Sequence, residues 1–316
     1  MSLLEHTSSA PAPARPVRDA PARKAPRRFT HREPFLLMAP ALILVGVFAG
    51  FPLLRSLWFA FNEANPFQGI TAFVGLDNFT AIFRDDEFGT FVRNTALWTF
   101  GAVGLQLTFG LLGALLLNTR FPLRGIYRGL AMIPWATPSV LVALMWMWIL
   151  DPNHGILNKA LMGLGVIDSP VALLSQTSTA LPTLIVIDVW QGVPLFAVMI
   201  LAALQAVPPE LKEAASMDGA GRLGVFRHVV VPAILPTVLI TTVLRLIWTA
   251  NYIDLPFILT GGGPGTASTT MALQSYVTAY KGGDFGEGAA YAVTQAVVLA
   301  VFVVLYVRLT RKAEIR

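Results

Sequence analysis

Six long apolar stretches, separated by shorter polar segments, dominate the pattern of the chain. They cover residues 35–61, 93–117, 129–150, 181–204, 233–259 and 289–308. A helix rises about 1.5 Å per residue, so about 20 residues cross the hydrocarbon core of a bilayer. The runs lack the strict alternation of outer-membrane barrel strands, which favours helices. The pattern therefore predicts an all-α polytopic membrane protein with six transmembrane helices.

Composition and charge placement agree with this interpretation and orient the chain. Hydrophobic residues make up 55% of the sequence and charged residues 13%, a balance typical of a protein in a bilayer. Most cations gather on one side, at Arg15, Arg18, Arg23, Lys24, Arg27, Arg28, Arg32, Arg120, Arg124, Arg128, Lys212, Arg222, Arg227, Arg308, Arg311, Lys312 and Arg316. Because cytoplasmic loops collect Lys and Arg, we expect both termini on the cytoplasmic side of an inner membrane.

The N-terminal residues differ in character from the rest. Residues 1–33 are rich in Ala, Pro and Arg with little to bury, which predicts a disordered basic tail before a transmembrane domain of residues 34–316. The first apolar run is too long for a signal-peptide core and lacks a suitably placed cleavage site, so we expect the first helix to be retained. Topology and contact with anionic lipid explain the net charge of +5, and no nucleic-acid partner is expected.

Signals for enzymatic chemistry are weak. The sequence has no cysteine and no phosphate-binding Gly-x-x-x-x-Gly-Lys-Ser/Thr loop. The glycine-rich residues 261–266 lack the lysine and predict an external turn. The four histidines are scattered without metal-ligand spacing, and the acidic residues 85–87 are expected to be solvated in an external loop. These features disfavour an enzyme and a metal site.

A polar segment at residues 206–232 interrupts the apolar pattern on the cytoplasmic side. Pro208 and Pro209 end the fourth long helix and open a short one. Gly219 then permits a sharp turn, and apolar residues at helical spacing predict a second short helix that runs up to Pro232 and the fifth apolar stretch. Phe226 on this helix is a candidate anchor for a partner. The segment fits either a docking surface or a packed intracellular loop.

The order of residues in this segment resembles the EAA loop of permease subunits in binding-protein-dependent ABC importers. Glu213-Ala214-Ala215 is followed after three residues by Gly219, and Val231-Pro232 closes the segment. The flanking residues 208–211 and 259–264 are similar to the sugar-transporting branch. Val229 and Val231 replace the usual isoleucine and leucine with similar apolar residues. The chain is therefore identified as resembling a type I permease of the maltose and glycerol-phosphate class.

This resemblance implies a transmembrane subunit that passes a carbohydrate from an external binding protein to the cytoplasm. Partners would be a second permease subunit and two ATP-binding cassette subunits, which would hold ATP and Mg, while this chain binds no cofactor. The implied ATPase-coupling residues are Glu213, Ala214, Ala215, Asp218, Gly219, Ala220, Phe226 and Pro232. A secondary transporter and a membrane scaffold without ATPase coupling are the alternatives.

Polar residues within the predicted spans are candidates for the substrate path. A charge at the centre of a membrane helix costs about 2.5–3.5 kcal/mol, so such residues tend to be functional. The candidates are Asp188, Gln191, Arg245, Trp248, Asn251, Tyr252 and Asp254. Aromatic rings and hydrogen-bond donors on the predicted fifth helix suit a sugar. Asn251 and Asp254 are expected nearer the external gate. The alternative is that these residues hold helices together or line the interface with a partner. Their spacing puts Arg245 about 10 Å deeper than Asp188, which predicts no direct ion pair.

Overall fold

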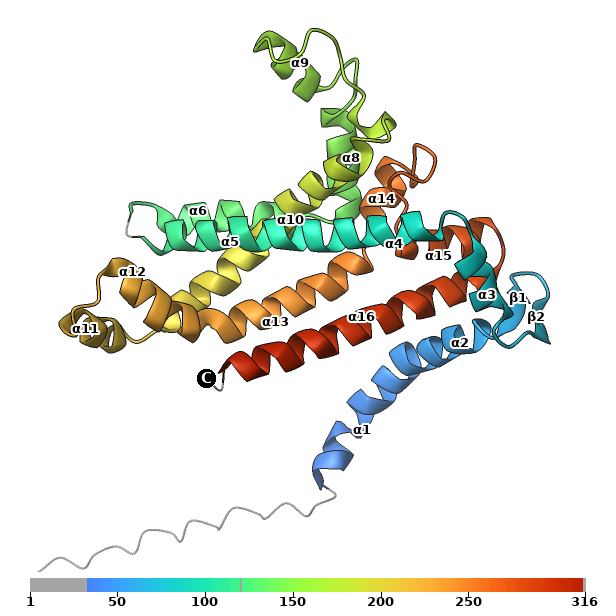
Figure 1. Cartoon of the computed structure of the whole chain (residues 1–316), viewed down its shortest axis with the longest axis horizontal. Helices are drawn as coiled ribbons and strands as arrows, with labels where there is room; N and C mark the ends of the chain where they lie inside the picture. The colour runs from blue at the N-terminus through green and yellow to red at the C-terminus, as the bar shows by residue number, and fades with distance from the viewer. Residues whose placement is uncertain (1–32, 120, 315–316) are drawn as a thin grey trace, which may run out of the picture. The chain divides into compact units, whose positions relative to one another are not determined.

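The computed structural model describes residues 33–119 and 121–314, which are predominantly helical (Figure 1). By its contacts the chain divides after Pro52 into two units. The first unit contains α1 (Glu33–Val45), the π-helix η1 (Gly46–Gly50) and the start of α2 (Phe51–Phe59). Apart from Glu33, the predicted tail of residues 1–33 lies outside the described residues, as does Arg120.

Five helical stretches in the described part of the chain are long and apolar enough to cross a membrane. They are Met38–Phe59, Phe88–Asn118, Ala180–Ala206, Arg222–Leu259 and Phe285–Arg308. A sixth crossing is possible if the bent pair Arg124–Ala136 and Ser139–Ile149 counts as one span. The predicted multi-pass helical fold is confirmed, but the single helix expected at 129–150 is broken.

The break in this third stretch bends the chain by 93°. It separates α6 (Arg124–Ala131) and α7 (Ile133–Ala136) from α8 (Ser139–Ile149). Pro138 is the cause, because a proline disfavours helical geometry in the residue before it. Thr137 accordingly has an extended backbone, with ψ at 129°.

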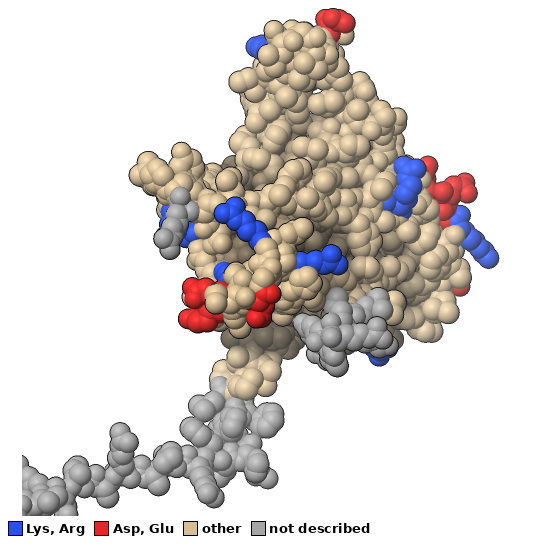
Figure 2. All heavy atoms as spheres, turned by 60° about the vertical axis from the view of Figure 1, so that its left-hand side comes forward, with Lys and Arg blue, Asp and Glu red and all other residues tan. Residues whose placement is uncertain are grey.

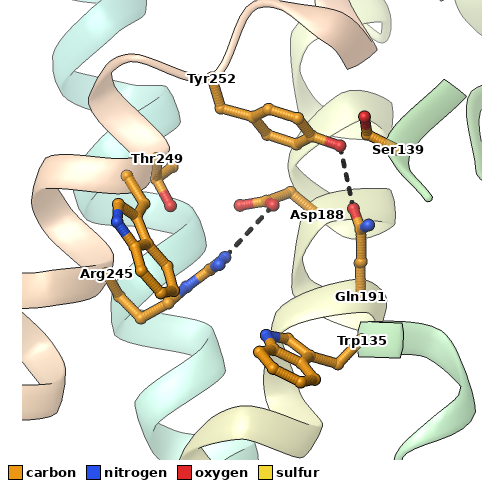
Figure 3. A pocket seen from close by; sticks show the side chains of 8 residues that line it. Trp135, Ser139, Asp188, Gln191, Arg245, Thr249 and Tyr252 are labelled. Carbon is orange, nitrogen blue, oxygen red and sulfur yellow. Dashed lines mark hydrogen bonds and ion pairs between the residues drawn. The ribbon is translucent and has the colours of Figure 1, made fainter. Parts of the chain in front are cut away.

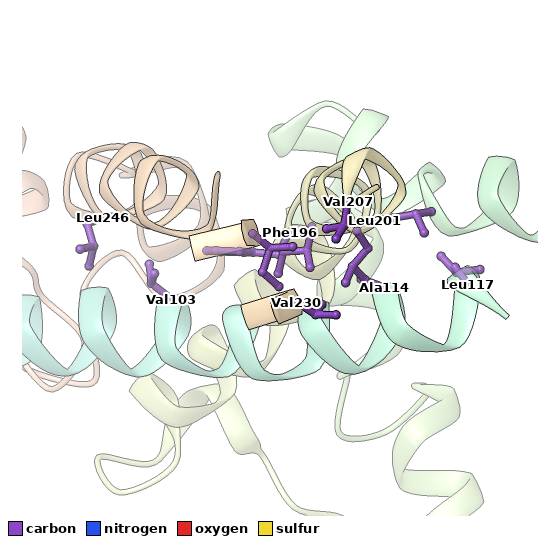
Figure 4. Packing of buried hydrophobic residues seen from close by; sticks show 11 residues of the cluster. Val103, Ala114, Leu117, Phe196, Leu201, Val207, Val230 and Leu246 are labelled. Carbon is purple, nitrogen blue, oxygen red and sulfur yellow. The ribbon is translucent and has the colours of Figure 1, made fainter. Parts of the chain in front are cut away.

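The second and fourth stretches form the closest helix pair in the second unit. The second contains α4 (Phe88–Ala96), η2 (Leu97–Gly101) and α5 (Ala102–Asn118), and the fourth is α10 (Ala180–Ala206). Gly110 on α5 lies so close to Phe196 on α10 that a Cβ would overlap it. Together with α13 (Val231–Ala250), these helices bury a cluster that includes Val103, Phe196 and Leu246 (Figure 4).

The fifth stretch also differs from the continuous helix expected at 233–259. It contains α13 and α14 (Asp254–Leu259), with residues 251–253 between them. Pro256 has no N–H to continue the helix, and its ring would clash with the carbonyl of Tyr252, four residues earlier. A second apolar cluster packs α14 against α8 and α10, with Val142, Leu184 and Leu255 fully buried.

A third apolar cluster, built around Phe91 and Tyr291, joins elements at one end of the second unit. These elements are α3 (Asp77–Arg84), α4, α15 (Met271–Tyr276) and α16 (Phe285–Glu314). The π-helix η5 (Val277–Lys281) follows α15 and contacts α16. Acidic residues expected to be solvated are engaged here: Tyr291 donates to Asp85 over 2.8 Å, and Thr266 donates to Glu87 over 2.6 Å.

A small antiparallel sheet corrects the expectation of an entirely helical chain. It pairs β1 (Asn62–Asn65) with β2 (Gly69–Phe73). The Asn65 side-chain oxygen accepts hydrogen bonds from the backbone N–H groups of Phe67 and Gln68. Gly69 has a φ of 74°, which favours glycine. The turn is therefore specified locally, by residues that the apolar pattern does not reveal. The remaining short elements outside residues 206–232 are α9 (Ile156–Gly163) and η3 (Leu173–Ser175).

Candidate functional site

A cavity of about 170 Å³ lies where α7, α8, α10 and α13 meet, below the break after α13 (Figure 3). Its lining combines indole rings with hydroxyl, amide and charged groups, from Trp135, Ser139, Asp188, Gln191, Arg245, Trp248, Thr249 and Tyr252. Five of the seven residues predicted for the substrate path are in this set, and the structure brings them together from two different helices and the 251–253 break.

Arg245 and Asp188 form a buried ion pair at one wall of the cavity. Their side chains approach to 3.4 Å between Nη2 and Oδ1 (Figure 3), and only 9% of Arg245 and 1% of Asp188 are exposed. The prediction that they lie too far apart is wrong. The depth of Arg245 was counted from residue 259, whereas α13 ends at Ala250, which makes the two residues similar in depth.

Gln106 on α5 completes this cluster. Its Nε2 donates to both Oδ2 and the backbone oxygen of Asp188, each over 2.9 Å, and its Oε1 accepts from Arg245 Nε over 2.9 Å. Gly192 on α10 leaves room for this carboxamide, because a Cβ there would overlap it. Gln106 was not among the predicted path residues, although an amide in the middle of the apolar run at 93–117 was a usable signal.

A second set of hydrogen bonds lies nearer the break after α13. Tyr252 donates its hydroxyl to Gln191 Oε1 over 3.1 Å, and Gln191 donates to the backbone oxygen of Thr137 over 3.4 Å. The Ser139 hydroxyl donates to a carboxylate oxygen of Asp254, which stands behind the lining. These bonds tie α8 to the start of α14, and they link α10 to the residues just before α8 and to the break after α13.

Thr249 and Asn251 differ in how they relate to the cavity. Thr249 lines the cavity, and its buried hydroxyl has no hydrogen-bond partner among the described residues. Asn251 is absent from the lining. It donates to the Ile247 carbonyl over 2.8 Å and accepts from Gln295 on α16 over 3.2 Å. Its contacts are those of a residue that joins helices.

The segment at residues 206–232 forms a helical projection at the other end of α13 (Figure 1). It contains α11 (Pro209–Met217), α12 (Arg222–Val225) and the π-helix η4 (Phe226–Val230). Gly219 has a φ of 88° between α11 and α12, which is a conformation that favours glycine. The predicted start at Pro209 and the glycine turn therefore match the structure.

The second helix of this segment runs up to Pro232 and the fifth stretch, as expected, and joins that stretch without a break. It continues through η4 into α13, and the whole stretch from Arg222 belongs to one candidate span. The N–H of Val231 bonds to the carbonyl of Phe226, five residues earlier. Local π-turns of this kind accommodate a proline within a membrane helix, which explains why Pro232 does not stop it.

The predicted coupling residues divide by exposure. Glu213, Ala214, Asp218, Gly219 and Pro232 are exposed, and Ala215 and Ala220 are half-buried. Figure 2 brings this end forward and shows both acidic and basic side chains on its surface. Phe226 is half-buried and packs against the apolar cluster of α5, α10 and α13. Its ring therefore connects the projection to the helix bundle.

Comparison with known proteins places this geometry in a family. A sequence model of the binding-protein-dependent transport system inner membrane component matches residues 106–314. The chain belongs to this family. It is thus a permease component of an ABC importer rather than an enzyme, and the prediction of an importer permease is confirmed.

Curated relatives of the permease match over nearly their whole length. The trehalose/maltose transport system permease protein MalF of Thermococcus litoralis is 34% identical, over 88% of this chain and 93% of the relative. The sulfoquinovosyl glycerol transport system permease protein SmoG of Agrobacterium fabrum is 32% identical, over 88% and 90%. The sn-glycerol-3-phosphate transport system permease protein UgpA of Yersinia pestis is 31% identical, over 86% and 90%.

A solved structure has the same fold. A chain of a bacterial ABC transporter involved in the import of the acidic polysaccharide alginate superimposes with a TM-score of 0.75 at 23% identity. The match covers 88% of the permease and 94% of that chain. At this identity the likeness supports the importer-permease fold and leaves the cargo to be argued from the site.

Proposed function

We propose that the permease carries a carbohydrate across the inner membrane and couples this movement to ATP hydrolysis through residues 206–232. One observation carries the proposal. A helical path runs without a break from Arg222 in the projection to Ala250, and Arg245 and Trp248 of the cavity stand on it. A displacement of the projection by a partner would therefore move one wall of the cavity.

The partners follow from the same arrangement. We infer that two ATP-binding cassette subunits bind ATP and Mg, since this chain has no phosphate-binding loop. The exposed Glu213, Ala214 and Asp218 would contact one of them, with Gly219 as the joint. A second permease subunit would complete the translocation path, and an external binding protein would deliver the cargo.

The chemistry of the cavity favours a carbohydrate. Hydroxyl, amide and guanidinium groups from Thr249, Gln191 and Arg245 offer donors and acceptors to sugar hydroxyls, and the indoles of Trp135 and Trp248 offer apolar ring faces. The curated relatives named above as transporting trehalose/maltose and sulfoquinovosyl glycerol support this class. Asp254 would act beside the cavity through Ser139, while Asn251 would link α13 to α16.

Co-purification followed by reconstitution tests the proposal. The permease is expected to retain an ATP-binding cassette subunit and a second permease through detergent extraction, and the complex in liposomes is expected to hydrolyse ATP faster with loaded binding protein. A secondary transporter would accumulate sugar without the ATPase chains. A scaffold would bind partners but move no sugar. Either result would refute the proposed coupling.

The orientation of the chain in the membrane is tested with single introduced cysteines. The sequence has no cysteine of its own, so any labelling reports on the introduced position. We expect Ser216→Cys on α11 to react with a membrane-impermeant maleimide only from the cytoplasmic side. Ser169→Cys, at an exposed position after α9, should react only from outside. Labelling of both from the same side would contradict the proposed topology.

A further inference from the structure

Negative side chains outnumber positive ones at the cavity. Its lining contains one cation, Arg245, and one carboxylate, Asp188. A second carboxylate, Asp254, accepts a hydrogen bond from the lining residue Ser139 and therefore lies directly behind the wall. Carboxylates outnumber the cation by two to one in this group of residues.

The single cation is also partly occupied. Arg245 directs Nε to Gln106 and Nη2 to Asp188, and both bonds are buried. An anion that leaves these bonds in place can use only the remaining N–H groups of the guanidinium, where it would share one cation with the Asp188 carboxylate. An anion that takes Nε and Nη2 as a bidentate fork would leave Asp188 as an uncompensated buried charge, which is strongly unfavourable.

We infer that the cavity accepts uncharged carbohydrates and rejects phosphorylated, sulfonated and uronic acid sugars. The inference rests on the proposed function and names its substrate class. Membership of the family does not decide the matter, because the curated relatives include permeases named for trehalose/maltose and for sn-glycerol-3-phosphate. Discrimination would come from repulsion at Asp188 and Asp254 as well as from attraction, as in other selective sites.

The groups left free in the cavity suit a neutral polyol. The Thr249 hydroxyl has no partner among the described residues. Gln191 and Tyr252 bond to each other at 3.1 Å and can each offer a further site to a sugar hydroxyl. Such bonds need no formal charge on the substrate, so binding leaves the Arg245–Asp188 pair intact.

Direct binding to the complete importer tests the inference without the external binding protein. The complex in lipid nanodiscs is titrated with maltose and trehalose, and with sn-glycerol 3-phosphate and glucuronate at matched ionic strength, while tryptophan fluorescence is recorded. Trp248→Phe identifies the part of the signal that arises at this cavity. The uncharged sugars are expected to bind at least about tenfold more tightly than the anions, since like charges oppose binding.

Charge variants sharpen the test. Asp188→Asn releases Arg245 and should shift the preference by about tenfold toward the anions. Asp254→Asn keeps the buried ion pair and should shift it less, in the same direction, which guards against a folding defect in the first variant. Asp168→Asn removes the same charge at an exposed position outside the lining and should leave the preference unchanged.

Two results would overturn the inference. One is a Trp248-dependent signal in which an anion binds as tightly as the uncharged sugars. The other is no Trp248-dependent signal with any of the four probes, which would also remove the cavity from the substrate path. Neither result touches co-purification with the ATPase chains, so failure of the inference and failure of the proposed coupling are distinguishable.

Discussion

At the scale of single residues, the buried ion pair of Arg245 and Asp188 is sensitive to substitution. Arg245→Ala would leave Asp188 buried, with Gln106 as its remaining side-chain partner. Removing one member of a buried pair costs about 3–5 kcal/mol. We expect a clear loss of thermal stability, measured as the recovery of monodisperse complex after heating. The double variant Arg245→Ala/Asp188→Ala should recover part of the lost stability, because it no longer buries an unpaired charge. If Arg245→Ala were as stable as the natural protein, the predicted cost of breaking the pair would be wrong.

A glycine on α10 is the second sensitive residue. Gly192→Ala places a methyl group where the Gln106 carboxamide lies, and overpacking of this kind costs about 1–3 kcal/mol. Gly104→Ala is the matched control, since a Cβ there meets nothing within 4 Å and alanine favours a helix by up to about 1 kcal/mol. In the same heating assay Gly192→Ala should be destabilised and Gly104→Ala should not. Similar behaviour of the two would mean that Gln106 has room to move.

At the scale of elements, the joint between α11 and α12 depends on one backbone conformation. Gly219 has a φ of 88°, whereas Gly221 has a φ of −68°. A residue with a Cβ costs about 1–2 kcal/mol in the left-handed region. We therefore expect Gly219→Ala to lower sugar uptake per ATP hydrolysed by about fivefold or more, measured in liposomes, while Gly221→Ala retains normal coupling. Normal coupling in Gly219→Ala would show that the joint tolerates another conformation.

The apolar pattern predicted the long helices but not their breaks. It located five stretches close to their observed positions, because about 20 apolar residues have few other stable arrangements. It missed the bend at Pro138 and the end of α13 before Pro256. An apolar stretch keeps its length when a proline interrupts its helical hydrogen bonds, so length alone does not reveal the break. The β1–β2 hairpin was missed for a related reason, since polar turn residues specify it.

The candidate site, like the fold, was only partly predictable from the sequence. Most of the polar residues chosen for their cost within the membrane do meet at one cavity. Which of them touch was beyond the sequence, because the depth of Arg245 depended on where α13 ends. Trp135 and Ser139 come from the bent third stretch, and their approach to α10 depends on a bend that no helical spacing encodes.

At the scale of the whole permease, the projection proposed for coupling and the cavity proposed for substrate lie at opposite ends of one continuous helical stretch. Phe226 packs into the apolar cluster that joins α5, α10 and α13, so a force on the projection would be shared by three helices. Such packed interfaces transmit discrete displacements better than a flexible loop does. Variants at the two ends should therefore fail in different ways.

Trp248→Ala and Glu213→Ala separate these failures. Trp248 lines the cavity, and loss of its ring should lower sugar uptake by about tenfold, or ~1.4 kcal/mol, while ATP-binding cassette subunits remain bound and hydrolyse ATP. Glu213→Ala should instead weaken retention of those subunits, so that uptake and sugar-stimulated hydrolysis fall together. Trp148→Ala is the matched control for the ring, because Trp148 is 76% exposed on α8 and lies outside the lining. Uptake, hydrolysis and subunit retention are measured on the same preparations. If Trp248→Ala also released the ATPase subunits, or if Glu213→Ala kept full coupling, the assignment of substrate contact and coupling to opposite ends of this stretch would be wrong.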